Sequence, residues 1–88
     1  MHDVVFSDHA LSEMARRGLT DAAVRRVLNA PQTTASVRAG RIVAQGTEVD
    51  IDTGKTYLIR VFVDVDRVPP VVVTAYRTSK LAKYGSGS

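Results

Sequence analysis

Residues 6–31 of this chain read FSDHALSEMARRGLTDAAVRRVLNAP, and this stretch decides how the fold begins. Ser7 is a good N-cap because its hydroxyl can accept a hydrogen bond from a free backbone N–H in the first turn of a helix. Gly18 lies where a glycine commonly ends a helix in the left-handed conformation. Together these two signals predict a helix from about Asp8 to Arg17.

The same signals repeat immediately after this helix. Thr20 is a second N-cap, and Pro31 closes a second helix because proline cannot continue one. The two short helices are therefore expected to form an αα-hairpin.

After Pro31 the apolar residues recur at every second position, which is typical of strands. The pattern predicts four strands, near residues 33–38, 41–49, 56–65 and 71–78. Turn-forming residues stand between them, at Ala39-Gly40, Asp52-Thr53-Gly54 and Pro69-Pro70. Such short connections favour an antiparallel meander. The predicted fold class is therefore α+β in the order ααββββ, two helices packed on a four-stranded sheet, with a final turn at Leu81 to Tyr84.

Each predicted helix has an apolar stripe at helical spacing. The stripe of the first helix consists of Leu11, Met14 and Ala15, and that of the second consists of Val24, Val27 and Leu28. Both helices can therefore pack on one face of the sheet and leave the other face partly open.

Length and composition limit the class of protein. The chain has 88 residues, 44% of them hydrophobic, which fits a single compact domain over residues 1–84. Residues 85–88, Gly-Ser-Gly-Ser, look like a flexible linker or an appended tail. The absence of cysteine excludes disulfides, thiolate nucleophiles and cysteine-based zinc sites. No signal peptide is evident at the start and no stretch approaches the ~20 apolar residues that cross a membrane, so a soluble, cytoplasmic protein is expected.

Charge is distributed unevenly along the chain, although the net charge is only +3. Arginines outnumber carboxylates in residues 1–45, carboxylates dominate residues 46–66, and residues 67–88 contain cations and no carboxylate. The strand predicted at 71–78 turns basic and aromatic at its end, which suits phosphate binding. A polyanion is one partner for this pattern; the other interpretation is an ordinary solvated surface.

Several stretches of the chain, taken together, resemble a known family. They are Phe6-Ser7-Asp8-His9-Ala10-Leu11 through Arg17-Gly18-Leu19-Thr20, then Val27-Leu28-Asn29-Ala30-Pro31, Tyr57-Leu58-Ile59-Arg60-Val61 and Val73-Thr74-Ala75-Tyr76-Arg77-Thr78-Ser79-Lys80. This ordered set resembles the bacterial domain-of-unknown-function 4258 family, whose small members look related to the RelE-like and BrnT-like toxins. The resemblance implies a RelE/barnase-like fold, a metal-independent RNA endonuclease of toxin–antitoxin type, and a cognate antitoxin as protein partner.

Metal-free RNA cleavage needs three kinds of group. A base removes the proton of the 2′-OH, cations stabilise the phosphorane, and an acid protonates the leaving 5′-oxygen, which gives a 2′,3′-cyclic phosphate. His9 is the candidate acid or base, because it lies in the first helical turn, where free backbone N–H groups favour an anion. Tyr76 is expected to stack a base or transfer a proton. The expected phosphate clamps are Arg60, Arg77 and Lys80, and further RNA contacts are expected from Arg16, Arg17, Arg41, Thr78 and Lys83.

No cofactor and no metal are expected. His9 and Glu13 are four residues apart and could supply two ligands, but no further histidine or cysteine completes a set.

Each site residue also has a structural interpretation. His9 lies opposite the apolar stripe of its helix, so it can simply face water. Arg60 either forks onto a phosphate or forms an ion pair, with Asp64 or with a carboxylate on a neighbouring strand. Tyr76 can be a half-buried edge tyrosine, and Arg77 falls on the opposite face of its strand.

The function as a whole has an alternative. The same basic edge would serve a non-catalytic module that binds RNA or another protein. Members of the family that this chain resembles often have an arginine in the middle of the first helix, where this chain has Glu13 and Met14. This difference favours the non-catalytic alternative.

Overall fold

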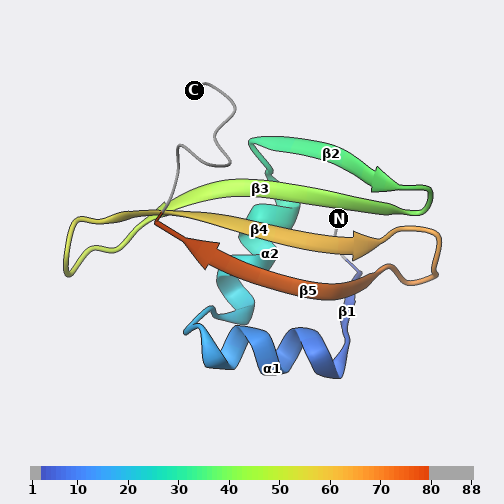
Figure 1. Cartoon of the computed structure of the whole chain (residues 1–88), viewed down its shortest axis with the longest axis horizontal. Coiled ribbons are helices and arrows are strands. Elements are labelled where there is room, and N and C mark those ends of the chain that lie inside the picture. Colours follow the sequence, from blue (N-terminus) through green and yellow to red (C-terminus); the bar gives the residue numbers. More distant parts are fainter. Residues whose placement is uncertain (1–2, 80–88) are drawn as a thin grey trace.

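Two helices and five strands make up the computed structural model, which describes residues 3–79 (Figure 1). The elements are β1 (Val5–Phe6), α1 (Asp8–Arg16), α2 (Asp21–Asn29), β2 (Thr33–Arg38), β3 (Arg41–Val49), β4 (Thr56–Asp64) and β5 (Val71–Thr78). The predicted α+β class, both helices and four strands are confirmed, with element ends within a residue of the predicted ones. The predicted turn at 81–84 and the tail at 85–88 lie outside the described residues.

The four-strand prediction was wrong by one strand. β1 pairs in parallel with β5, with Val5 opposite Val71 and Phe6 opposite Val72, so the sheet order is β1-β5-β4-β3-β2. Two residues are too few to show an alternating pattern, and their partners lie 66 positions further along the chain. No local signal in the sequence could therefore have revealed this strand.

Local hydrogen bonds explain where the helices begin and end. Ser7 Oγ accepts a hydrogen bond from the Ala10 N–H at 3.0 Å, and Thr20 Oγ1 accepts one from the Ala23 N–H at 3.1 Å. Gly18 has a φ of 67°, which glycine adopts without steric cost. The α1 carbonyls then accept from the residues beyond the helix, in the pattern of a Schellman motif. The predicted caps are confirmed.

The two helices differ in how many of their residues are buried against the sheet. α2 buries Val24, Val27 and Leu28 as predicted. In α1 the predicted stripe was right at Met14 and wrong at its other two positions: Leu11 is 48% exposed and Ala15 is exposed, and Ala10 is buried in their place. The reason is that α1 lies along β5 near the edge of the sheet, so only a narrow stripe with a spacing of four residues contacts the strands (Figure 1).

Both helices lie on the same face of the sheet. β4 turns Ile59, Val61 and Val63 toward them, and all three side chains are fully buried. α2 lies behind β3 and β4 in Figure 1, and no helix among residues 3–79 covers the front. We call this front the open face. The helices in this part of the chain are too short to cross a membrane.

Close contact between α2 and β3 depends on a glycine. Gly46 is buried in β3, and a Cβ atom placed there would lie 3.3 Å from Cγ2 of Val27 on α2. A larger side chain would therefore push the helix away from the sheet.

We expect Gly46→Val to lower the free energy of unfolding by about 1–3 kcal/mol, the usual cost of overpacking a core. Urea denaturation measures this change. The neighbouring Thr47→Ser is the control, because Thr47 is exposed and serine keeps the hydroxyl that accepts from Gln32, so the free energy of unfolding should change by no more than about 0.5 kcal/mol. The cost of Gly46→Val should shrink in a Val27→Ala background; an equal cost in both backgrounds would contradict the contact.

Candidate functional site

A row of four polar side chains crosses the open face, one from each of the strands β2 to β5. The register places Thr33 beside Gln45, Gln45 beside Arg60, and Arg60 beside Tyr76. Arg60 Nε donates to Gln45 Oε1 at 2.5 Å, and Arg60 Nη1 donates to the Tyr76 hydroxyl at 2.7 Å. Gln45 Nε2 in turn donates to Thr33 Oγ1 at 3.1 Å. These bonds hold the row, which we call the polar row, in one arrangement.

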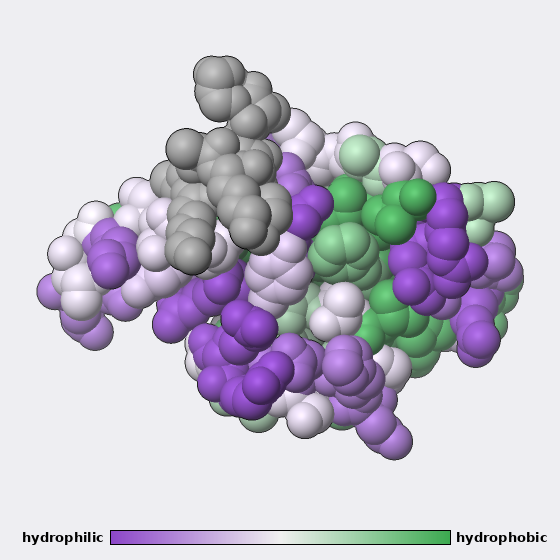
Figure 2. Space-filling model, viewed as in Figure 1, coloured by the Kyte–Doolittle hydropathy of each residue, from purple (hydrophilic) through white to green (hydrophobic). Residues whose placement is uncertain are grey.

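Apolar side chains flank the polar row on the same face. Val43 and Leu58 are only 5% and 6% exposed, although neither belongs to the core beneath the helices. The Phe62 ring lies 6.2 Å from the Tyr76 ring and 5.3 Å from the Arg60 guanidinium. Figure 2 views this face and shows hydrophobic surface gathered beside hydrophilic residues. The open face therefore places two aromatic rings beside a guanidinium, with buried aliphatic side chains packed next to them.

Tyr76 has a second guanidinium beside it. The Arg17 guanidinium lies over the Tyr76 ring, 5.6 Å from its centroid. Arg17 is the C-cap of α1, and it can reach the open face because this helix lies along β5 near the edge of the sheet. Tyr76 thus lies between cations from two parts of the chain, Arg60 on a strand and Arg17 at a helix end.

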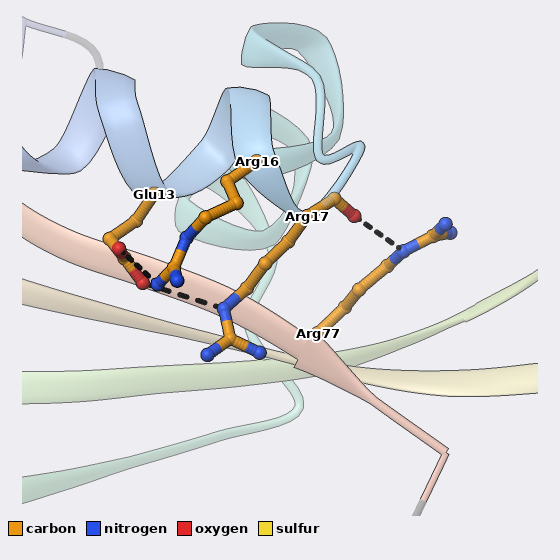
Figure 3. Close-up of polar contacts among 4 residues, drawn as sticks. All are labelled: Glu13, Arg16, Arg17 and Arg77. Carbon is orange, nitrogen blue, oxygen red and sulfur yellow. Dashed lines mark hydrogen bonds and ion pairs between the residues drawn. The ribbon is translucent and has the colours of Figure 1, made fainter.

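Arg77 points to the other side of the sheet, as strand alternation predicts. It pairs with Ile59, and its guanidinium lies 4.4 Å from the centroid of the Tyr57 ring. Its Nε donates to the main-chain oxygen of Arg17 at 3.3 Å (Figure 3). Tyr76 and Arg77 therefore do not share one face, but both contact Arg17, one through the side chain and the other through the backbone.

Glu13 binds two of the arginines at the end of α1. Its carboxylate accepts from Arg16 Nη2 at 2.5 Å and from Arg17 Nε at 3.5 Å (Figure 3). The hydrogen bond from Arg16, with the positive charges of Arg16 and Arg17, holds the pKa of Glu13 below its ordinary value. The carboxylate is therefore ionised at neutral pH, and its charge offsets part of the positive charge beside Tyr76.

His9 does not join these residues. It is exposed in the first turn of α1, at the end that Ser7 caps, whereas Arg17 is at the other end. Eight residues of helix separate the two positions, a rise of about 12 Å. Within residues 3–79, no three histidine, cysteine, aspartate or glutamate side chains gather closely enough to hold a metal ion.

Arg41 lies at the end of the open face and forms a bidentate ion pair with Asp64. Its Nε and Nη2 donate to the two carboxylate oxygens of Asp64 at 2.6 and 3.1 Å. This hydrogen bonding, followed by the charges of Arg41, Arg38 and Arg67, lowers the pKa of Asp64. Asp64 thus pairs with Arg41, and the contacts of Arg60 in the polar row are with neutral groups.

The remaining predicted residues lie apart from one another. Thr78 is half-buried on β5 opposite Leu58, and Arg16 is exposed at the end of α1. Lys80 and Lys83 lie outside the described residues. Of the predicted site, the structure brings together Arg60, Tyr76 and Arg17, and Arg16 shares the Glu13 carboxylate with Arg17.

Sequence reasoning missed Gln45 and Phe62 as members of this site. Gln45 interrupts an apolar run, Ile42-Val43-Ala44, in a predicted strand, and a polar residue in that place signals a partner on the next strand. Alternation along the predicted strand does place Phe62 on the same face as Arg60, but its aromatic contact with the guanidinium was not anticipated.

The Arg41–Asp64 pair makes stability depend on pH. Because the pKa of Asp64 is lower in the folded chain, the pair stabilises the fold above the unfolded-state pKa of about 3.9, and this contribution is lost as the pH falls through the folded-state value. We expect Asp64→Asn to unfold at a lower urea concentration than wild type at pH 7, and the difference to fade in acid. Asp52→Asn, in the exposed β3–β4 turn, is the control and should match wild type throughout. A difference for Asp64→Asn that is the same at pH 7 and pH 2.5 would contradict the assignment.

Comparison with known proteins identifies a family. No curated protein and no solved structure matches the chain. The family described as domain of unknown function (DUF4258) matches residues 6–77, a segment that begins in β1 and ends one residue before the end of β5. The match therefore includes both helices, the polar row and Arg17, and the chain belongs to the DUF4258 family.

Proposed function

We propose that this domain binds single-stranded RNA on the open face of its sheet. The observation that supports this most strongly is the position of Tyr76, whose hydroxyl accepts from Arg60 and whose ring lies beneath Arg17. An aromatic ring can stack an unpaired base, while guanidinium groups bind the phosphates on either side of that base. Bases in a duplex are already stacked on one another, so the natural ligand is a single strand.

The surroundings of Tyr76 suit the same ligand. Phe62 offers a second aromatic surface 6.2 Å away, far enough for a neighbouring base to be splayed out beside the first. The Gln45 amide, held between Arg60 and Thr33, adds groups that can hydrogen-bond a base edge.

A metal-independent endonuclease of toxin type is the second candidate function. The observation that favours it is the 2.7 Å hydrogen bond between Arg60 and the Tyr76 hydroxyl. In that arrangement the phenol transfers a proton to or from the reacting oxygen, while Arg60 stabilises the charge of the phosphorane. His9 would take part only with an RNA that extends about 12 Å along α1.

The resemblance to RelE-like and BrnT-like toxins supports the second candidate. In that case the arrangement of two helices and an antiparallel sheet is a RelE/barnase-like fold, and the natural substrate is cytoplasmic RNA, including mRNA on the ribosome. A cognate antitoxin would then cover the open face and block access to Tyr76.

RNA binding is expected to depend on the polar row. We expect Arg60→Gln to weaken binding of a labelled oligouridylate about 10-fold, and Tyr76→Leu to weaken it by about 1–3 kcal/mol through lost stacking. Fluorescence anisotropy measures both affinities. Arg26→Gln removes the same charge as Arg60→Gln but from an arginine that pairs with Glu48, so it is the matched control. Equal weakening by the two arginine variants would mean that the open face has no special role.

Cleavage separates the two candidates. End-labelled single-stranded RNA is incubated with the protein in excess chelator, and the products are examined for a 2′,3′-cyclic phosphate. If the domain is an endonuclease, Tyr76→Phe should keep the affinity, because the ring remains, and lose at least about 100-fold in cleavage rate, because the hydroxyl is gone. His9→Ala and Arg77→Ala, both away from the polar row, should retain most of the activity. Intact RNA together with saturable binding would rule out the endonuclease and support a non-catalytic RNA-binding domain.

A further inference from the structure

We propose that Glu13 occupies, in the free protein, the place that a phosphate of the bound RNA takes. This inference rests on the proposed RNA-binding function. Each oxygen of the Glu13 carboxylate accepts from a different guanidinium, Oε2 from Arg16 and Oε1 from Arg17 (Figure 3). Guanidinium groups donate charge-assisted hydrogen bonds to phosphate oxygens as they do to carboxylate oxygens. A phosphate can therefore replace the carboxylate without any rearrangement of the arginine backbones.

The position of Glu13 agrees with this role. Arg17 lies over the Tyr76 ring, so an anion bound to Arg17 lies next to any base stacked on that ring. In a single strand each base is joined through its sugar to a phosphate, and the two groups must be bound side by side. Glu13 thus lies where the phosphate of a stacked nucleotide would lie, bound to the arginine that would hold that phosphate.

Arg17 is fixed in place before the ligand arrives. It is the C-cap of α1, its N–H donates to Glu13 and Ala15 carbonyls, and its own carbonyl accepts from Arg77. Its guanidinium can therefore exchange one anion for another while its backbone stays where it is. Such preorganisation favours binding because little ordering is left to be done.

The contacts of Glu13 are of a kind that a ligand can displace. They join residues three and four apart on the helix surface, and the Arg16 and Arg17 side chains are 66% and 45% exposed, while the Glu13 side chain is 19% exposed. Exposed ion pairs of this kind contribute little to stability. The competing explanation is that Arg16 and Arg17 only complement the negative end of α1 and that Glu13 is an ordinary surface partner.

A charge-matched pair of variants distinguishes the two explanations. Asp21 accepts from Arg25 at 2.6 Å in an exposed pair on α2, four residues apart, so Asp21→Asn removes the same charge from the same kind of contact. The affinity of each full-length variant for an oligouridylate of about 10 nucleotides is measured at several salt concentrations. We expect Glu13→Gln to bind about 3- to 10-fold more tightly than Asp21→Asn, since the RNA no longer has to displace a carboxylate.

A second variant locates the effect at Arg17. Arg17→Gln should weaken binding and lower the salt dependence by about 0.7 in log–log slope, the value of one phosphate contact on a single strand. In the Arg17→Gln background, Glu13→Gln should give no gain beyond that of Asp21→Asn. Equal affinities of Glu13→Gln and Asp21→Asn in the wild-type background would overturn the inference while the proposed function stood. Failure of the wild-type protein to bind the RNA saturably would overturn both.

Discussion

The alternation of side chains along β4 is the constraint on which the rest of the structure depends. β4 lies between β3 and β5 in the sheet. Its odd-numbered residues face the helices, and its even-numbered residues face the opposite way. Ile59, Val61 and Val63 fill the core, and this leaves Arg60 and Phe62 on the open face. A slip of one residue would bury Arg60 and expose the core residues, so the hydrophobic effect that fixes the register also fixes the site.

The end of α1, beside β5, brings a second arginine to Tyr76. α1 lies along β5, and the Schellman motif at Gly18 ends it beside Tyr76. Arg17 therefore contacts both Tyr76 on the open face and Arg77 on the other. A single helix end thus links the two faces of β5, and it brings Glu13 with it because Glu13 is one helical turn earlier.

The uneven distribution of charge along the sequence is partly neutralised in the fold by ion pairs. Within residues 3–79, five arginines form ion pairs, and some of these pairs join segments that differ in charge. Arg26 bonds Glu48, and Arg41 bonds Asp64, so carboxylates of the acidic segment neutralise cations of the basic one. The chemistry of the site depends on which arginine lies beside which aromatic ring, and less on the total of positive charge.

The sequence by itself determined both helices, four strands, the faces of β4 and the separation of Tyr76 from Arg77. Capping hydrogen bonds and strand alternation involve residues only a few positions apart, so their signals are local. Only the tertiary structure decided β1, the narrow buried stripe of α1, and the contact of Arg17 with Tyr76. Each of these depends on segments about 60 residues apart in the chain. The buried stripe and the Arg17 contact also depend on the line along which α1 packs against β5, which the hydrophobic pattern of a short helix does not specify.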